Sequence, residues 1–203
     1  MQKQRCPWAQ NDRLMATYHD TEWGMPVHDD WKWFEFILLD TFQAGLSWRT
    51  ILHKRENFRE AFDGFDFNKI ARYNDEKIVS LLDNKGIIRN KLKIFATISN
   101  ARAFLELRAR SGAFNNYIWQ FTDGMPKINH WNHPADVPVT TSESDAMSKD
   151  LKKNGFKFVG STTCYAFIQA GGMVNDHLTI CFRHHDCTMA ATVLSSSVFP
   201  PKG

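Results

Sequence analysis

Residues 81–91 read Leu81-Leu82-Asp83-Asn84-Lys85-Gly86-Ile87-Ile88-Arg89-Asn90-Lys91. The step Asn84-Lys85-Gly86 is a turn signal, and apolar residues at helical spacing stand on both sides of it. Asp75 opens the first helix, and the second begins near Arg89 and ends at Ser111-Gly112. The stretch therefore predicts two helices joined by a short glycine turn.

This turn carries positive charge. Lys85, Arg89 and Lys91 surround Gly86, and Lys93 follows on the second helix. The backbone amides of such a turn and of the helix N-terminus after it can hold a phosphate. This is the layout of a helix–hairpin–helix, which binds the DNA backbone without reading the base sequence. The other interpretation is a helical hairpin whose basic end is only solvated, and the stretch by itself leaves both open.

Helical periodicity dominates the rest of the chain, and no convincing alternating strand is present, so we expect an all-α fold. Residues 1–187 are expected to form a single domain, with an irregular connection at 122–141, and residues 188–203 a disordered or irregular tail. The other expected helices cover Trp31–Ala44, Ser47–Phe62, a short segment opened by Asp66, Phe114–Phe121, a segment from the capping box Ser142–Asp145 to Gly155, and the last main helix, opened by Ser161 or Thr162.

With 203 residues, of which 43% are hydrophobic and 23% charged, the chain is long enough for one folded domain and too apolar for wholesale disorder. A net charge of +3 and a pI of about 8.7 are compatible with a nucleic-acid partner but are weak evidence for one. No stretch approaches the roughly 18 apolar residues that cross a bilayer, and the first residues lack the apolar core of a signal peptide. We therefore expect a cytoplasmic protein.

Four residues suit a zinc ion: Cys6, His19, His177 and Cys181. Four cysteines in the whole chain are too few for a disulfide scaffold, so cysteine near histidine is better interpreted as metal ligation. His177 and Cys181 are four residues apart and share one face if the segment is helical. Two thiolates and two imidazoles make a closed tetrahedral site, which is structural rather than catalytic.

Such a site would tie residues 1–25 to residues 170–187. Spacing alone also allows Cys6 and His19 to be ordinary surface residues. Three nearby residues could serve as metal ligands instead, namely His184, His185 and Cys187.

Aromatic and acidic residues gather on three neighbouring segments. Tyr18, Trp23 and Trp48 offer flat walls on which a flipped base can stack, and Asp40 offers a polar group for its edge. Aromatic rings also favour a cationic base, by about 1–2 kcal/mol when it is desolvated. The alternative is that the aromatic residues belong to the core and that Asp40 is a solvated residue near a helix end.

Taken together, several strings of the sequence resemble the DNA-3-methyladenine glycosylase I family. They occur in the family's order and cover residues 6 to about 181. The strings are Tyr18-His19-Asp20-x-Glu22-Trp23-Gly24, Gln43-Ala44-Gly45-Leu46-Ser47-Trp48, Lys54-Arg55-Glu56-Asn57-Phe58-Arg59, Gly86-Ile87-Ile88-Arg89, Phe156-Lys157-Phe158-Val159-Gly160 and Val174-Asn175-Asp176-His177.

The resemblance implies a helix–hairpin–helix superfamily fold in which the zinc site joins the N- and C-terminal regions. It implies one structural Zn²⁺ per chain, with the ligands Cys6, His19, His177 and Cys181. It implies that Tyr18, Trp23 and Trp48 line the base pocket. It also implies that the Gly45-Leu46 loop is the wedge that fills the gap left by the flipped nucleotide.

Two positions depart from the family's pattern. Asp40 stands where the family usually has a pocket glutamate, and Met15 stands where it often has a tyrosine. Aspartate is one methylene shorter, and methionine removes one hydroxyl contact. Both changes bear on the efficiency of the site and the range of bases that it accepts.

The implied activity is base-excision repair of alkylation damage. The substrate is double-stranded DNA that contains 3-methyladenine, and hydrolysis of the N-glycosidic bond gives free base and an abasic site. Asp40 is the expected catalytic carboxyl, and no lysine is evidently placed for Schiff-base chemistry, so a monofunctional enzyme is expected. No obligate protein partner is expected. The alternatives are a weak or inactive DNA-binding relative, a glycosylase for another damaged base, and a zinc hydrolase, which a closed four-ligand site disfavours.

Overall fold

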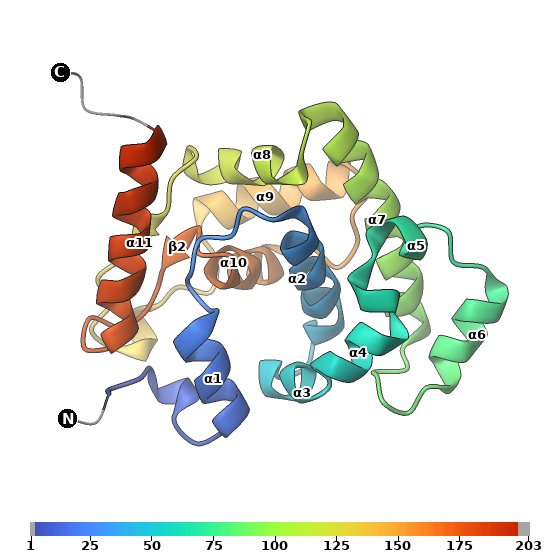
Figure 1. Ribbon diagram of the computed structural model, residues 1–203, viewed down its shortest axis with the longest axis horizontal. Coiled ribbons are helices and arrows are strands. Elements are labelled where there is room, and N and C mark those ends of the chain that lie inside the picture. The colour runs from blue at the N-terminus through green and yellow to red at the C-terminus, as the bar shows by residue number, and fades with distance from the viewer. Residues whose placement is uncertain (1–2, 199–203) are drawn as a thin grey trace.

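The computed structural model describes residues 3–198 of the chain (Figure 1). The all-α prediction is confirmed, apart from one short parallel pair formed by β1 (Lys127–Ile128) and β2 (Val174–Asn175). None of the helices in this part of the chain is both long and apolar enough to cross a bilayer. The helices are α1 Arg13–Thr21, α2 Asp30–Gln43, α3 Trp48–His53, α4 Arg55–Ala61, α5 Phe67–Ile70, α6 Asp75–Asp83, α7 Lys91–Ser111, α8 Phe114–Ile118, α9 Ser142–Lys153, α10 Ser161–Ala170 and α11 Phe182–Val198.

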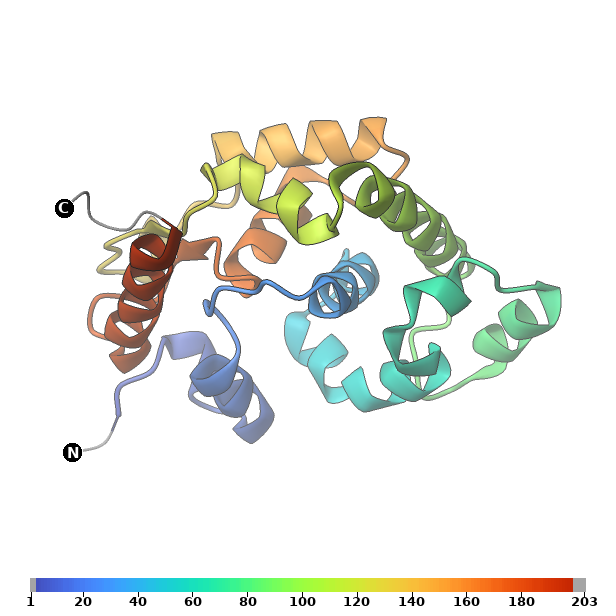
Figure 2. The ribbon, with the colours of Figure 1, turned by 45° about the horizontal axis from the view of Figure 1, so that its top comes forward.

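Helix α2 lies at the centre of the molecule and packs against both α7 and α10 (Figures 1 and 2). Asp29 caps its first turn by accepting from two backbone N–H groups. Every residue from Trp33 to Phe42 is buried, as expected for a helix that is apolar on nearly all sides. Two acidic residues, Glu35 and Asp40, are buried within this apolar surface.

Some predicted helix boundaries are wrong. Ser47 caps α3 as expected, but the single helix predicted over residues 47–62 breaks at Lys54, which ends α3 and begins α4. The predicted capping box is also displaced by one residue, since Thr141 rather than Ser142 caps α9. Ser47 and Thr141 each start a helix by accepting a backbone hydrogen bond, whereas α4 begins without a side-chain cap.

Two asparagines build the turn between α6 and α7. The side chain of Asn84 accepts from the backbone N–H of Gly86 at 2.8 Å, and that of Asn90 accepts from a backbone N–H in the first turn of α7 at 3.1 Å. The second helix therefore begins at Lys91, two residues after the predicted start near Arg89. Two side chains of the α3–α4 region donate to the Gly86 carbonyl, so this turn is held against the body of the molecule.

The prediction of an irregular tail is wrong for residues 188–198, which belong to α11. The expected domain boundary at residue 187 therefore falls inside a helix, and α10 is not the last one. The side chain of Asn175 in β2 donates to the Thr188 hydroxyl at 3.1 Å, so α11 is docked by a tertiary contact that its own sequence does not reveal. The remaining residues of the predicted tail, 199–203, lie outside the described range.

Candidate active site and metal centre

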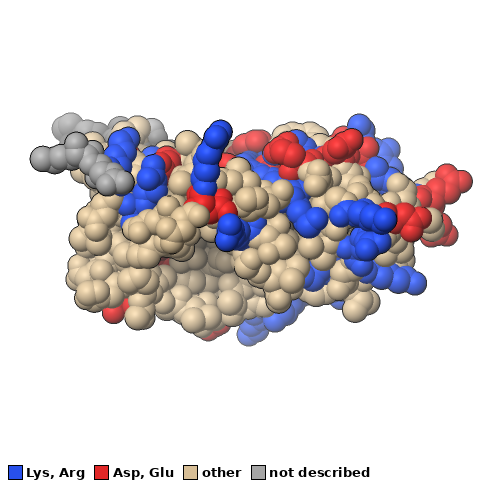
Figure 3. Space-filling view, turned by 90° about the horizontal axis from the view of Figure 1, so that it is seen from below, with Lys and Arg blue, Asp and Glu red and all other residues tan. Residues whose placement is uncertain are grey.

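Tyr18, Trp23, Asp40 and Trp48, which sequence reasoning grouped, all line one cavity of about 230 Å³. Figure 3 shows a hollow in a largely uncharged part of the face on which α1 and α3 lie. The cavity draws its walls from α1, α2, α3 and α10, so it joins segments that are far apart in the sequence. The lining residues are Trp8, Met15, Tyr18, Trp23, Asp40, Gln43, Trp48, Ala166, Gln169 and Ala170.

Two aromatic pairs form much of the wall. The rings of Tyr18 and Trp48 lie 5.2 Å apart with 48° between their planes, and those of Trp8 and Trp23 lie 5.2 Å apart with 78° between them. Sequence reasoning missed Trp8. The signal that could have found it is its position two residues after Cys6, because a ligand that fixes Cys6 also fixes Trp8.

The Asp40 carboxyl is the unusual group of this cavity. Asp40 is only 5% exposed, and its Oδ2 is buried without a hydrogen-bond partner in the described part of the chain. Burial raises the pKa of Asp40 well above its usual range, so the carboxyl favours its protonated form in the free protein. The indole N–H of Trp48 is also buried without a partner among the described residues. A buried donor and a buried acceptor, both unpaired at one cavity, suit a polar ligand.

This raised pKa gives a testable stability profile for Asp40→Asn. Folded protein keeps the Asp40 proton over a pH range in which the unfolded chain, with a pKa of about 3.9, has lost it. The stability that the protonated carboxyl contributes is therefore complete below about pH 4 and is lost as the pH rises towards the folded pKa. Asparagine cannot ionise. We expect the variant to melt about 3 °C or more above wild type at about pH 7.5, because each pH unit between the unfolded and the folded pKa of Asp40 costs the wild type about 1.4 kcal/mol of stability.

Thermal melts of the two proteins between about pH 4 and pH 8 measure this difference. The gain should shrink towards zero as the pH falls. A difference in melting temperature that stays constant across the range would contradict a raised Asp40 pKa.

Met15 lies in the same wall. It is 8% exposed and forms a small buried cluster with Tyr18 and Leu52. The departure from the family's pattern at Met15 therefore changes the surface that a base would meet, whereas a change at a solvated position would not.

Two other carboxylates near the cavity are fully engaged. Glu22 accepts from both terminal nitrogens of Arg55 at 2.8 Å, and Glu35 accepts from Arg55 Nε at 2.8 Å. Burial opposes the ionisation of Glu22, but the hydrogen bonds from Arg55 and Lys32 outweigh it and lower its pKa to about 2. These ion pairs join the segment after α1 to α2 and α4. Neither glutamate lines the cavity, which leaves Asp40 as its carboxyl.

The Gly45-Leu46 loop borders a second hollow beside the cavity, where it faces Thr162 and Thr163 of α10. Gly45 has φ +78°, a conformation that glycine adopts without strain, and it turns the chain sharply after α2. Leu46 next to it is 41% exposed. An apolar side chain thus projects from the end of the helix that carries the cavity carboxyl.

Lys93 does not join the other basic residues of the α6–α7 turn. It is 5% exposed, and its ammonium donates to the carbonyl oxygens of Phe42 at 2.7 Å and Ala44 at 2.6 Å. Burial lowers its pKa. Lys93 therefore fixes the C-terminal end of α2, with the glycine loop after it, against α7.

The remaining basic residues of the turn face solvent. Lys85, Arg89 and Lys91 are exposed, and Gly86 is partly buried between them. Within residues 3–198 no ion pair occupies any of these three side chains. In Figure 3, lysine and arginine side chains are most numerous on the right of the face, others lie along its upper edge, and the hollow lies in an uncharged area left of the centre.

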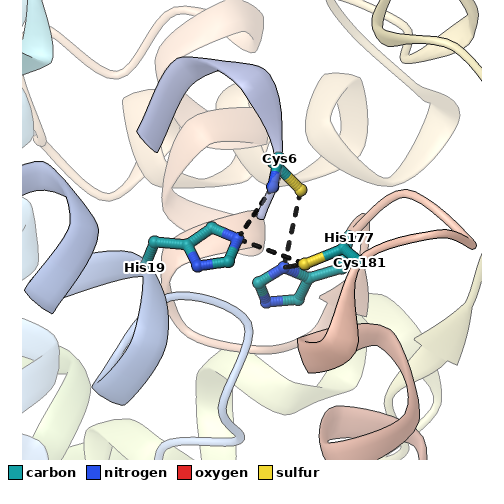
Figure 4. A group of neighbouring side chains, drawn as sticks. All are labelled: Cys6, His19, His177 and Cys181. Atoms are coloured by element: carbon teal, nitrogen blue, oxygen red, sulfur yellow. Dashed lines mark hydrogen bonds between the residues drawn. The ribbon is translucent and has the colours of Figure 1, made fainter. Parts of the chain in front are cut away.

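The four predicted metal ligands converge at one point (Figure 4). Their ligand atoms all lie within 4.8 Å of one another, and all four side chains are buried. Cys181 Sγ lies 3.4 Å from His19 Nε2 and 3.6 Å from His177 Nδ1, and Cys6 Sγ lies 3.7 Å from His177 Nδ1. Tetrahedral zinc, with bonds of about 2.3 Å to sulfur and about 2.0 Å to nitrogen, separates such atoms by about 3.5 Å. The group could hold a metal ion of this kind.

The second nitrogen of each histidine also has a partner. Nδ1 of His19 pairs with the Asp20 carboxylate at 2.8 Å, and Nε2 of His177 pairs with the Trp23 carbonyl at 3.1 Å. Such outer contacts fix the ring orientation and tautomer of metal-binding histidines. Gly24 is required here, because it has φ +81° and a Cβ would lie 2.9 Å from the His177 ring.

The local structure around the ligands adds two features that the sequence left open or missed. His177 and Cys181 lie in a turn before α11 rather than on a helix, and the backbone N–H of Cys181 donates to Leu178 O at 2.8 Å. Helix α1, which the sequence did not predict, begins between Cys6 and His19 and carries His19. The three competing residues, His184, His185 and Cys187, lie outside the cluster.

The metal centre and the cavity share their framework. Tyr18 of the cavity precedes the ligand His19, and the ring of Trp23 lies edge-on to that of His177 at 4.6 Å. Trp8 follows Cys6 by two residues. An ion bound by the four ligands would thus hold three aromatic walls of the cavity in place.

The segments that build the cavity and the metal cluster also match known proteins. Residues 8–184 match the family model described as methyladenine glycosylase. The chain belongs to the methyladenine glycosylase family. The match includes every residue that lines the cavity and three of the four cluster residues, with Cys6 two positions before its start.

Within this family, the chain is 47% identical to DNA-3-methyladenine glycosylase 1 of Escherichia coli strain K12 over 178 residues, which cover 88% of this chain and 95% of that protein. A crystal structure of a 3-methyladenine DNA glycosylase I superposes with a TM-score of 0.86 at 51% identity and covers 88% of this chain and 98% of that one. A tyrosine-to-phenylalanine variant of 3-methyladenine DNA glycosylase I, solved in complex with 3-methyladenine, superposes with a TM-score of 0.85 at 32% identity over 88% of this chain and 96% of that one.

Proposed function

We propose that this chain is a DNA glycosylase that hydrolyses the N-glycosidic bond of 3-methyladenine in alkylated duplex DNA. The observation that carries the proposal is the buried carboxyl of Asp40, whose Oδ2 has no hydrogen-bond partner among residues 3–198, in an aromatic cavity of a chain of the methyladenine glycosylase family. Relatives that cover nearly the whole of the described chain are named for this activity.

The cavity supports a mechanism based on binding of the flipped base. Methylation at N3 makes the base cationic and weakens its bond to the sugar, so the leaving group needs little activation. Tyr18 and Trp48 offer π faces to the cation, and Asp40 offers a carboxyl whose ionisation a neighbouring cation favours. The bound base then leaves as a neutral molecule while water attacks the sugar.

The lining residues also limit the chemistry. Asp40 is the acidic member of the lining, and the lining contains no lysine. A Schiff base with the sugar therefore has no nucleophile at this cavity. We infer a monofunctional enzyme that leaves an abasic site and an intact strand.

We further propose that the metal is a single structural Zn²⁺. Its four ligands are Cys6, His19, His177 and Cys181, whose spacing fits tetrahedral zinc. All four positions are filled by protein groups, so the ion has no open position for catalytic water. It would tie the N-terminal residues 1–25 to residues 170–187, and a zinc hydrolase is disfavoured.

For DNA binding we propose that α6, its turn and α7 act as a helix–hairpin–helix. The exposed residues Lys85, Arg89 and Lys91 surround Gly86, and the Gly45-Leu46 loop would serve as the wedge beside the flipped nucleotide. We expect Lys85→Gln combined with Arg89→Gln to weaken binding to all duplex sequences alike. The slope of log affinity against log salt should flatten by about 2, since each phosphate contact contributes about 0.9.

Fluorescence anisotropy with an undamaged duplex at several salt concentrations measures that slope. The matched control neutralises two lysines of α9, Lys152→Gln and Lys153→Gln, and should leave the slope unchanged. An unaltered slope in the variant of the turn would favour a solvated hairpin instead.

A panel of damaged duplexes tests the proposed function and its alternatives. We expect free 3-methyladenine to be released, with 7-methylguanine and hypoxanthine released much more slowly. Preferred release of another base would make the chain a glycosylase for that lesion. Binding without release of any base would make it an inactive relative.

A further inference from the structure

A buried carboxylate with four donors lies behind the base cavity. Asp176, directly after β2, is 2% exposed. Its Oδ1 accepts from the side chains of Asn129 and Trp131, each at 2.7 Å. Its Oδ2 accepts from the Tyr165 hydroxyl at 2.5 Å and from Gln169 Nε2 at 2.7 Å. These contacts fix the positions of side chains from α10 and from the long connection before α9.

Gln169 is the one of these four donors that also lines the base cavity. A carboxylate only accepts hydrogen bonds, so the amide nitrogen of Gln169 must face Asp176. Its amide oxygen is thereby turned away from Asp176. That oxygen has no hydrogen-bond partner in the described part of the chain. Gln43 also lines the cavity, but its side-chain amide makes no hydrogen bond within residues 3–198, so it can present either of its ends.

We propose that Gln169 Oε1 is a fixed acceptor for the exocyclic amine of the flipped base, and that Asp176 is the positioning residue that orients it. The inference rests on the proposed function. It names Gln169 as the residue that distinguishes an adenine-type base from a guanine-type base. An adenine-type base carries an amine with two N–H donors at this edge, so it can meet Asp40 and Gln169 together. A guanine-type base carries a carbonyl oxygen there, which meets a second acceptor. Sites built around a fixed hydrogen bond reject the mismatched base strongly.

The Asp176→Asn variant changes this orientation without touching the base. Trp131 offers Asp176 only an N–H donor, so the oxygen of the new amide stays on the Trp131 side. Its NH₂ group then faces Gln169 and turns the Gln169 oxygen inward. The Gln169 amine now faces the cavity, which favours a base with a carbonyl. The Gln169→Met variant removes the acceptor at similar side-chain length.

The experiment measures release of 3-methyladenine and 3-methylguanine from one preparation of dimethyl-sulfate-treated duplex DNA, so both bases share every other condition. We expect the ratio of their kcat/KM values to fall at least about tenfold in Asp176→Asn and in Gln169→Met, as for a loss of about 1.4 kcal/mol. Asp150→Asn is the matched control. Asp150 also accepts from a tyrosine hydroxyl, that of Tyr117 at 2.6 Å, but it lies away from the cavity, and its variant should keep the ratio.

Zinc content is measured in each variant, because Asp176 precedes the ligand His177. If Gln169→Met keeps the ratio of kcat/KM for 3-methyladenine to that for 3-methylguanine within about threefold of wild type, the inference is overturned. This holds even if Asp176→Asn proves too unstable to measure. Equal loss of both bases in Gln169→Met overturns it as well, since that result indicates packing alone. Failure of the wild type to release 3-methyladenine contradicts the proposed function itself, which is a separate outcome.

Discussion

Replacing Cys181 by alanine should release the metal and lower the melting temperature by about 10 °C. The four ligands come from the two ends of the described chain, and Cys181 Sγ lies within 3.6 Å of both histidine nitrogens. Structural zinc adds several kcal/mol to folding, and each kcal/mol shifts the melting temperature by about 2–4 °C at this size. Elemental analysis and thermal melts measure both effects.

The same variant should also lose excision activity. Trp23 contacts the ring of His177, and Tyr18 precedes His19, so an empty metal site loosens two aromatic walls of the cavity. Cys187→Ala is the matched control. Cys187 is buried near the cluster, where its thiol contacts Met25 at 3.8 Å, and its variant should keep the metal. Full zinc occupancy in Cys181→Ala would show that the ligand set is wrong.

Asp40→Asn should reduce release of 3-methyladenine at least tenfold, equivalent to about 1.4 kcal/mol of barrier. The variant keeps the size of the side chain but removes the charge that favours a cationic base over neutral adenine. The same variant should be more stable than wild type at neutral pH, because burial opposes the ionisation of Asp40 and asparagine does not ionise. Slower excision together with a higher melting temperature is the signature of a group retained for function.

Asp40→Glu is the informative partner of this variant. It restores the residue usual in the family and should keep or raise the activity. Single-turnover excision with saturating enzyme separates this effect from DNA binding, which both variants should retain. Excision by Asp40→Asn at the wild-type rate would remove Asp40 from base recognition. Glu22 and Glu35, the two other carboxylates near the cavity, already pair with Arg55 and do not line it.

The parts of the fold that the sequence predicts are those with a local signal. Helix α2 is predicted because its apolar run is continuous, and the α6–α7 turn is predicted because Asn84 and Gly86 punctuate two periodic segments. Helices α1 and α11 were missed. The first is largely polar and carries the cluster residue His19, and the second is docked by Asn175 of β2. In both cases the stabilising contacts come from residues distant in the sequence.

In the candidate site, too, the sequence predicts some features and misses others. Residue types and the family strings indicated the four ligands and the cavity residues Tyr18, Trp23 and Trp48, which the structure brings together. They did not show that Asp40 is buried and unpaired, since an aspartate near a helix end is ordinarily solvated. Nor did they show that Lys93, grouped with the basic turn, is buried against the carbonyls at the end of α2. Burial of a charged side chain depends on the packed structure, which no local pattern encodes.

The most direct test of the account is single-turnover release of base from a methylated duplex by the purified wild-type protein. The released base is identified by mass spectrometry, and the rate is compared with spontaneous depurination of the same DNA. The account predicts rapid release of 3-methyladenine, with strand breaks that appear only after alkali treatment of the abasic sites. Release no faster than spontaneous loss, by protein that carries its metal and binds the duplex, would contradict it.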